Sequence, residues 1–485
     1  MQISELLSLL PDDTAGDYRG DPGADFNGLT VRFSGKRVRG KFCVMLTESW
    51  GSAKAVKKYF SPEVSFAKHI ASARRNGALG FVLPREFADD PAVAGTNAFF
   101  TDDTANFAFT ATTAIRNSAS AGRITAITGS AGKSTTKSMI THALKQLVPS
   151  EDIYSPGSTQ NVEASILGHM SMNHRYPHSV LEIAGSAFHR FRRNGFAPSA
   201  DVSIVTSISE AHLDYLSDTA TVADIKSDIF RDPPPAGIAV INVDTLHSDI
   251  LVRRAVRAGR QLVTYGQSEG ATIRLRDYDI ATGSVTAEIG DELLSYTVGA
   301  RGRHMALNSL AVIATLRALG FRDWRRAVAS LATFEALDGR GKSIELNVAG
   351  GVVTMIDESY NANPASMRAA IETFNDMRAG RSGRKIAVLG DILELGSEAE
   401  SIHLSLVDLL EAAQFDQVHL VGEYMGAVGE ALADRGVETA HWTNLDHLIA
   451  ALRAGLRADD EMLFKSSNGT GVHLVVSALV GVESR

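Results

Sequence analysis

The sequence is poor in cysteine and has no long hydrophobic run. Its single cysteine, Cys43, cannot form an internal disulfide bond. No apolar stretch reaches the roughly 18 residues that a membrane-spanning helix needs, and the first segment, MQISELLSLLPDD, lacks the basic and apolar parts of a signal peptide. The formal net charge is −8, so no overall positive field attracts nucleic acid or an anionic membrane. We therefore expect a cytoplasmic protein without nucleic-acid or membrane partners, and we take it to be a monomer.

Strand and helix patterns, in contrast, alternate along the whole chain. The 485 residues are 44% hydrophobic, which is enough material for several cores. We predict an α/β protein of three domains. These are a small α/β N-terminal domain at residues 1–118, a central P-loop ATP-binding domain with a parallel sheet at 119–336, and a Rossmann-like C-terminal domain at 337–485.

The central prediction depends on four nearly continuous apolar runs, RITAIT, SVLEIAG, DVSIVTSI and GIAVINV. Parallel strands that are covered by helices on both faces have this composition. The turn-rich segment ALDGRGKS at 336–343 marks the next boundary. Beyond it, GVVTMIDESY, KIAVLGD, QVHLVGE and EMLFKSS are predicted strands separated by helical segments, so the last part forms another α/β unit.

The stretch ITAITGSAGKSTTKSMI, residues 124–140, has the order strand, glycine-rich loop and helix. The glycines allow successive backbone N–H groups to face one oxyanion, and the helix directs its positive end to the same place. The spacing Gly-x-x-Gly-Lys-Ser is two residues shorter than the full P-loop pattern. We predict that Lys133 binds the β- and γ-phosphates of ATP and that Ser134 is a ligand of Mg²⁺. The predicted ATP-binding residues of this loop are Gly129, Ser130, Ala131, Gly132, Lys133, Ser134 and Thr135.

Three polar residues downstream stand where apolar ones are expected. Glu182 ends the strand SVLEIAG and His212 follows the strand DVSIVTSI, and open α/β sheets bind ligands at the carboxyl ends of their strands. Lys226 lies in the helix TVADIKSDIF, next to the apolar positions Val222 and Ile229. A buried amine tends toward its neutral, nucleophilic form, which can add CO₂ to become a carbamate with two metal-binding oxygens. The other interpretation is a lysine whose amine reaches water along its aliphatic stem.

Together, GSAGKS, Glu182, EAHLDYL and IKSDIF resemble the central domain of the Mur ligases, the ATP-dependent enzymes that form amide bonds in peptidoglycan assembly. The resemblance implies that Glu182 and His212 hold a second Mg²⁺ and that Lys226 is carbamylated. GRHMALNSLAVIATLRALG resembles the family's helix with an adenine-reading asparagine, here Asn308. DGRGKSIE matches the linker whose arginine, here Arg340, reaches ATP when the C-terminal domain closes.

Two further segments, IDESYNANPASMRAAI and AVLGDILELG, resemble the MurF-type branch, which adds D-alanyl-D-alanine to UDP-N-acetylmuramoyl-tripeptide. Asp357 is then a nucleotide-binding candidate for the ribose, while Asp391 and Glu394 either line the cleft or cap the next helix. The resemblance implies the catalytic residues Lys133, Lys226, His212 and Arg340, and the metal ligands Ser134, Glu182, His212 and Lys226.

The implied activity is an ADP-forming ligation of a small-molecule carboxylate to an amine. A carboxylate of the first substrate, bound by the N-terminal domain, attacks the γ-phosphate of ATP to give an acyl phosphate. An amine then attacks the acyl carbon, and phosphate leaves. The substrates and the general base are not encoded in any motif of the sequence.

Both substrate ends depart from the family pattern. The N-terminal Asp-Ser-Arg triplet is missing from RFSGKRVRGKFCVML, the C-terminal Lys-Gly-Ser-Arg becomes Lys-Ser-Ser-Asn at 465–468, and GSTQNVEAS offers Asn161 alone. The chain is thus either a divergent MurF-type enzyme or a paralogue that forms a different amide on a substrate without UDP. A phosphotransferase and a non-catalytic nucleotide-binding protein are further alternatives.

Overall fold

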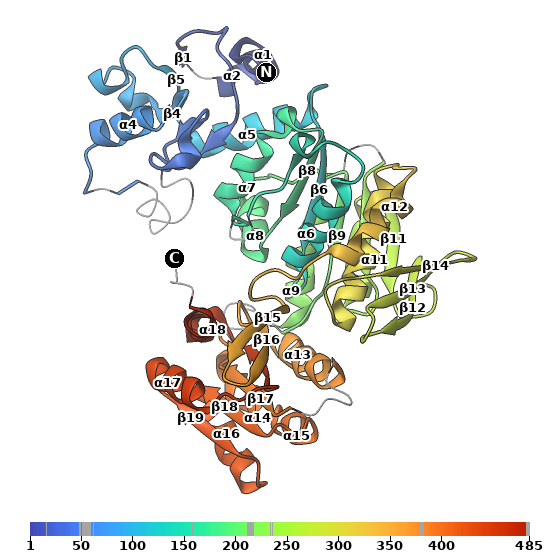
Figure 1. Ribbon diagram of the computed structural model, residues 1–485. Helices are drawn as coiled ribbons and strands as arrows, with labels where there is room; N and C mark the ends of the chain where they lie inside the picture. Colours follow the sequence, from blue (N-terminus) through green and yellow to red (C-terminus); the bar gives the residue numbers. More distant parts are fainter. Residues whose placement is uncertain are drawn as a thin grey trace.

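The computed structural model describes residues 1–15, 17–47, 50, 60–61, 63–157, 160–210, 218–232, 234, 236–377 and 383–481. These residues form three α/β domains, each built on its own sheet (Figure 1). The strands of the three sheets fall within residues 17–101, 123–297 and 342–465. The predicted three-domain α/β architecture is confirmed. The proposed boundaries after residues 118 and 336 lie between the sheets and stay predictions.

The N-terminal sheet has the strand order β1-β5-β4-β3-β2. β1 runs antiparallel to β5, and the other neighbours are parallel. Its strands are β1 (Asp17–Arg19), β2 (Leu29–Thr30), β3 (Phe42–Val44), β4 (Gly80–Pro84) and β5 (Asn97–Thr101). Its helices are α1 (Ile3–Leu9), α2 (Asp12–Ala15), α4 (Phe66–Arg75) and α5 (Thr104–Asn117).

Helix α5 joins this domain to the central one. Asp103 caps its amino end by accepting hydrogen bonds from the N–H groups of Ala105 and Asn106. The ring of Phe109 on α5 packs at 5.2 Å from that of Phe196 in the central domain. Because one continuous hydrophobic core includes both rings, the N-terminal sheet has a fixed place beside the central domain.

The central sheet has the order β14-β13-β12-β11-β10-β9-β6-β8-β7. Its strands are β6 (Arg123–Thr128), β7 (Ile153–Tyr154), β8 (His178–Glu182), β9 (Val202–Val205), β10 (Ile238–Asn242), β11 (Gln261–Gly266), β12 (Ile273–Asp279), β13 (Ser284–Ile289) and β14 (Glu292–Thr297). Its helices are α6 (Lys133–Leu144), α7 (Glu163–Met170), α8 (Gly185–Arg193), α9 (Thr219–Lys226), α10 (Ser248–Arg257), α11 (Arg303–Ala318) and α12 (Trp324–Ala329).

The prediction of a parallel sheet holds for β6 to β12 but is wrong for the last two strands. β13 pairs antiparallel with β12 on one side and with β14 on the other. Only residues 280–283 join β12 to β13, and residues 290–291 join β13 to β14. Connections of four and two residues are too short to carry the chain back to the start of a parallel neighbour, so these strands form hairpins. The alternation of exposed and buried positions along β13 fits a hairpin strand with one face in the core.

The C-terminal sheet has the order β15-β16-β20-β17-β18-β19, with β15 antiparallel to β16 and the other pairs parallel. Its strands are β15 (Lys342–Val348), β16 (Gly351–Glu358), β17 (Lys385–Gly390), β18 (Gln417–Val421), β19 (Thr439–Trp442) and β20 (Glu461–Lys465). Its helices are α13 (Pro364–Met377), α14 (Ala399–Leu404), α15 (Val407–Ala412), α16 (Tyr424–Asp434), α17 (Leu445–Gly455) and α18 (Val472–Val480).

Asp391 follows β17 and stabilises the C-terminal domain. Its carboxylate accepts hydrogen bonds from the N–H groups of Tyr424 and Met425 at the start of α16. The fully buried His403 next to it accepts a hydrogen bond from the N–H of Ile392 at 2.9 Å. Asp391 therefore caps α16 and not the next helix along the chain, α14, and it is only 4% exposed.

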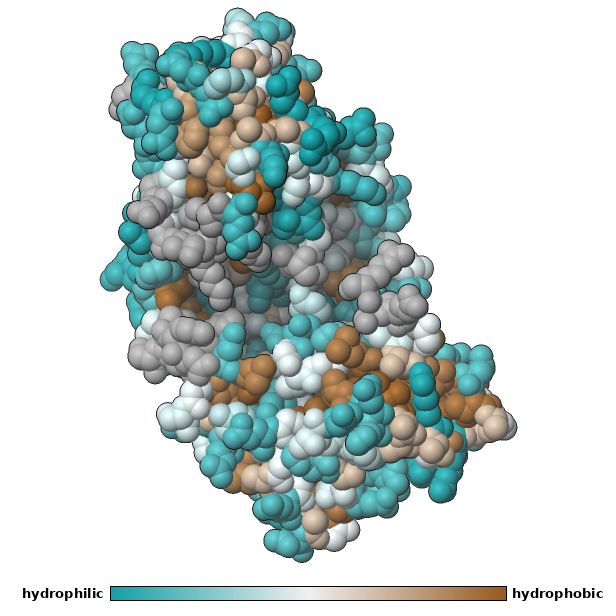
Figure 2. All heavy atoms as spheres, turned by 90° about the vertical axis from the view of Figure 1, so that its left-hand side faces the viewer, coloured by the Kyte–Doolittle hydropathy of each residue, from teal (hydrophilic) through white to brown (hydrophobic). Residues whose placement is uncertain are grey.

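The surface shows where apolar side chains lie outside the cores. On the face drawn in Figure 2, hydrophobic side chains gather on the lower part of the molecule, which is the C-terminal domain. Exposed leucines of this domain include Leu393 after β17 and Leu474 on α18. Within the described ranges, none of the helices combines the length and the apolar character needed to cross a bilayer.

Candidate active site

The predicted phosphate loop connects β6 to α6, as the sequence indicates. Gly129 and Gly132 have φ angles of 153° and 81°, which L-residues rarely adopt. A Cβ atom at Gly129 would collide with Oγ1 of Thr206, and one at Gly132 would lie 2.9 Å from Oδ1 of Asn308. Glycine is therefore required at both positions, because the backbone turns sharply against the neighbouring strand and against α11.

The loop is held by the segment that follows β9. The N–H of Ser130 donates to the carbonyl of Ser207 at 2.7 Å, and the N–H of Ala131 donates to the hydroxyl of Ser207 at 2.9 Å. Gly132 precedes α6 without a side-chain cap. No side chain of its own therefore neutralises the positive amino end of α6. This helix end is available to bind a phosphate group.

Lys133 lies in the mouth of this loop. Its Nζ donates to the carbonyls of Gly129 at 2.8 Å and Ser130 at 3.4 Å. Burial lowers the pKa of Lys133, the carboxylate of Glu182 opposes this effect, and the charge of Arg340 adds to it. These contacts place the predicted cation beside the oxyanion site.

Glu182 is at the carboxyl end of β8, as predicted, and is only 4% exposed. Its Oε2 accepts a hydrogen bond of 2.6 Å from the hydroxyl of Ser134, and its Oε1 accepts one of 2.9 Å from the amide of Asn161. Carboxylate, hydroxyl and amide oxygens are ligands that Mg²⁺ accepts, and this set fits the ion. In the described part of the chain, no group of three His, Cys, Asp or Glu residues forms a metal cluster. His212 lies outside the described residues.

Lys226, at the end of α9, is 3% exposed, so the predicted burial is confirmed. Its Nζ donates to the carbonyl of Gly129 at 3.1 Å, the same oxygen that Lys133 binds. Burial, followed by the charge of Lys133, lowers the pKa of Lys226 to about 7. A large share of this amine is therefore neutral near neutral pH, and it lies directly behind the phosphate loop.

Helix α11 and the interdomain linker complete the site. Asn308 on α11 packs its side chain against Gly132. One turn earlier, Nε2 of His304 is 3.9 Å from Oε1 of Glu358 in the C-terminal domain. A cavity of about 520 Å³ opens between these domains, lined among others by His304, Phe334 and Glu358. Arg340 in the linker is close enough to lower the pKa of Lys133. The structure thus brings Asn308 and Arg340 to the phosphate loop.

Asp357 lies at the end of β16, where both of its carboxylate oxygens already accept hydrogen bonds. Oδ2 binds the N–H of Gly339 at 2.9 Å, and Oδ1 binds the N–H and the hydroxyl of Ser359. The residue thus ties the linker to the C-terminal domain. Oδ2 retains a further lone pair, and ribose binding by Asp357 stays a prediction.

Lys137 is a site residue that sequence reasoning missed. It is 4% exposed, one helical turn beyond Lys133, and its ammonium donates to the carbonyl of Pro156. Burial lowers its pKa, while the charges of Glu182 and Arg340 act on it in opposite directions. The spacing of four residues from Lys133 is the signal that could have identified it, because i and i+4 share one helix face.

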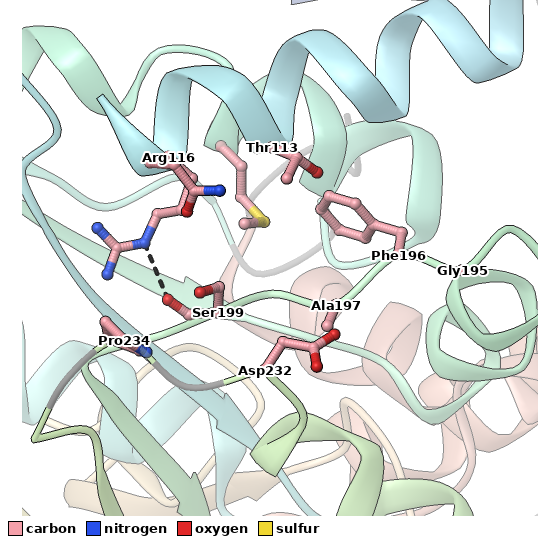
Figure 3. Close-up of a pocket in the computed structure, with 10 residues that line it drawn as sticks. Thr113, Arg116, Gly195, Phe196, Ala197, Ser199, Asp232 and Pro234 are labelled. Atoms are coloured by element: carbon pink, nitrogen blue, oxygen red, sulfur yellow. Dashed lines mark hydrogen bonds between the residues drawn. The ribbon is translucent and has the colours of Figure 1, made fainter. Parts of the chain in front are cut away.

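A second cavity, of about 470 Å³, lies at the opposite end of the strands of the central sheet (Figure 3). Arg116 lines it and binds the carbonyl of Ser199 at 2.9 Å, while Asp201 neutralises its charge at 2.6 Å. Ser199 precedes β9, so this cavity belongs to the amino ends of the strands. The phosphate loop and Glu182 lie at the carboxyl ends, and the two sites are separate.

Two family models match the chain. Residues 127–316 match the Mur ligase middle domain, and residues 339–468 match the Mur ligase, glutamate ligase domain. The UDP-N-acetylmuramoyl-tripeptide–D-alanyl-D-alanine ligase of Synechocystis sp. is 29% identical over 363 residues, which are 74% of this chain and 74% of that protein. The ligase of the same name from Escherichia coli is 28% identical over 370 residues, 74% of this chain and 76% of that protein.

Solved structures show the same fold over nearly the whole length. MurF from Acinetobacter baumannii superimposes with a TM-score of 0.77 at 20% identity and covers 99% of both chains. MurF ligase from Thermotoga maritima, in complex with ADP, gives a TM-score of 0.70 at 20% identity and covers 97% of this chain and 98% of that one. With the two matched domains holding the phosphate loop, the buried lysine and the linker arginine, the chain belongs to the Mur ligase family.

Proposed function

We propose that this protein is a MurF-type ligase, which joins D-alanyl-D-alanine to UDP-N-acetylmuramoyl-tripeptide at the expense of ATP. The substrates are those in the names of its curated relatives. The observation that carries the proposal is the convergence of Lys133, Lys226, Glu182 and Ser134 on one phosphate loop. A protein that merely binds a nucleotide has no use for a second, buried lysine behind that loop.

The nucleotide is held along the carboxyl edge of the central sheet. The phosphates bind the N–H groups at the start of α6 and the ammonium of Lys133, and Asn308 lies on the way from this loop to the cavity between the domains. The base and the sugar bind beside this loop, with Asn308 reading the adenine edge and Asp357 binding the ribose. Ser134 and Glu182 would hold Mg²⁺, which would supply neutralisation of the phosphate charge.

Lys226 is carbamylated in the working enzyme. The lone pair of its neutral amine attacks the carbon of CO₂, a C–N bond forms, and the proton passes to water. A buried cation is exchanged for an anion with two oxygens, close to the ammonium of Lys133. The lowered pKa and the nearly complete burial of Lys226 support this step.

Catalysis then consists of positioning and charge neutralisation. A carboxylate oxygen of the first substrate attacks the γ-phosphorus, and the bond to ADP breaks while Lys133 and Arg340 face the developing charge. The amine nitrogen of the second substrate attacks the acyl carbon of the resulting acyl phosphate. The C–O bond to phosphate breaks and the nitrogen gives up a proton, which yields the amide.

The first substrate extends to the N-terminal domain. Three cationic side chains lie where that domain contacts the central domain. They are Arg37, Lys41 and Arg175. Burial lowers the pKa of Lys41, and the charges of both arginines lower it further. Within the described ranges, none of the three forms an ion pair within 4.0 Å of an Asp or Glu. The rings of Tyr154 and Tyr176 stack at 4.9 Å beside them. An unpaired cationic group with aromatic rings suits a nucleoside diphosphate, which favours the UDP-bearing substrate.

Calorimetric titration with UDP is expected to show binding that depends on this group. Replacing Lys41 by methionine removes a half-buried ammonium and should weaken UDP binding by roughly 10-fold or more, which is the effect of losing one charge-assisted hydrogen bond. Lys68→Met, on the exposed face of α4 in the same domain, is the matched control and should bind as the wild type does. Failure of the unaltered protein to bind UDP at millimolar concentration would restore the alternative substrate without UDP.

A coupled assay of ADP release tests the ligase activity itself. Purified protein with ATP and Mg²⁺ is expected to release ADP only when UDP-N-acetylmuramoyl-tripeptide and D-alanyl-D-alanine are both present. Mass spectrometry should then find the amide product with the loss of one water from the combined substrates. Sustained ADP release without the amine, with a stable phosphorylated product, would instead identify a phosphotransferase.

A further inference from the structure

The linker that carries Arg340 is tied to a loop of the C-terminal domain. Gly339 donates its N–H to Asp357, and the N–H of Tyr360 donates to the carbonyl of Gly339 at 3.1 Å. The N–H of Gly341 donates to the carbonyl of Asp357 at 2.8 Å. Arg340 therefore has a fixed backbone position, because the residues on both sides of it are bound to the end of β16.

The approach of linker and loop requires glycine. Gly339 has a φ angle of 70°, and a Cβ atom there would lie 2.6 Å from Cβ of Tyr360. This close packing brings the ring of Tyr360 under the side chain of Arg340. The guanidinium carbon lies 4.2 Å from the centroid of the ring, which is the geometry of a cation–π pair.

The guanidinium of Arg340 also lies near two lysines. Arg340 lowers the pKa of both Lys133 and Lys137, so its charge acts at the phosphate loop. Within the described ranges, no carboxylate lies within 4.0 Å of Arg340. The ring of Tyr360 thus stabilises the positive charge of Arg340, which is repelled by Lys133 and Lys137. This charge is available to bind an anion.

We propose that Tyr360 is a positioning residue, whose ring holds the guanidinium of Arg340 toward the γ-phosphate before the nucleotide arrives. This inference rests on the proposed ligase function. An arginine side chain has many rotamers, and a ring that selects one of them removes that disorder in advance of the reaction. The ring acts through Arg340, and the competing explanation is direct contact between Tyr360 and the nucleotide.

Steady-state kinetics of Tyr360→Leu tests the proposal. We expect kcat to fall about 10-fold, with a change of less than about threefold in KM for ATP, because the charge assists phosphoryl transfer more than binding. Tyr360→Phe retains the ring and should restore most of the lost kcat. Phenylalanines with one, two and three ring fluorines at this position should lower kcat stepwise, since each fluorine weakens the attraction of the ring for a cation.

A double-mutant cycle separates the two explanations. If Tyr360 acts through Arg340, the double variant Arg340→Met/Tyr360→Leu should be no slower than Arg340→Met alone. Multiplication of the two losses, or equal kcat along the fluorine series, would overturn the proposal. Arg325→Met is the matched control, since it removes an exposed guanidinium that faces the ring of Trp324 at 4.4 Å on α12, and it should leave kcat unchanged.

A structural measurement keeps this inference distinct from the proposed function. A crystal structure of Tyr360→Leu without substrates should show the Arg340 side chain displaced, with the backbone bonds between Gly339 and Asp357 intact. An unmoved guanidinium would refute the positioning role even in an active ligase. A displaced one in a protein without ligase activity would refute the proposed function and leave the cation–π contact standing.

Discussion

Replacing Lys133 by methionine is expected to lower kcat/KM for ADP release by about 10² to 10³-fold. Its ammonium lies at the phosphate loop, where it binds the carbonyls of Gly129 and Ser130. In the reaction it exchanges these carbonyls for phosphate oxygens, whose negative charge increases as the bond to ADP breaks. The measurement is the coupled ADP assay with both substrates present.

The control is Lys145→Met, which removes an exposed lysine after the same helix, α6. It should retain wild-type kinetics. Both variants should unfold with similar midpoints, because the methionine at 133 keeps the aliphatic stem and relieves a buried charge. Wild-type turnover by Lys133→Met would remove the phosphate loop from the mechanism, and Mg-ATP would have to bind elsewhere.

The parts of the site that the sequence predicts are those formed by local patterns. Strand, loop and helix around Gly129 are encoded within residues 124–140, and the position of Glu182 follows from the end of one apolar run. Lys226 is recognisable because apolar residues occur at helical spacing around it, and the structure confirms its burial. Each of these features depends on neighbours within about four residues, where periodicity is informative.

The parts that the sequence does not predict depend on pairing between distant residues. Gly339 is a turn residue in the sequence, and only its contact with Tyr360 shows that it locates the linker arginine. Lys41 looks like an ordinary surface lysine until Arg175 of another domain lies beside it. No local pattern records such long-range contacts. The hairpins after β12 are a different case, because their short turns are present in the sequence and outweigh the general α/β pattern.

Lys226→Ala is the second variant with a large expected effect. It should lower kcat by about 10² to 10³-fold, since the proposed carbamate would be lost together with its two oxygens. Acetate or formate added to this variant should restore part of the activity, because a small carboxylate can occupy the space behind Gly129. The same salts should not rescue Lys133→Met, which lacks a cation rather than an anion.

The pH dependence gives the carbamate hypothesis a direct test. Because burial lowers the pKa of Lys226 to about 7, its amine is largely neutral above that pH and able to add CO₂, whereas protonation blocks the addition below it. Activity in CO₂-depleted buffer should therefore be low and should rise with bicarbonate, more steeply above pH 7 than below. ¹³C-bicarbonate should produce one carbamate NMR signal that is absent from Lys226→Ala. Full activity of the alanine variant without any added carboxylate would show that this buried lysine only supports the loop.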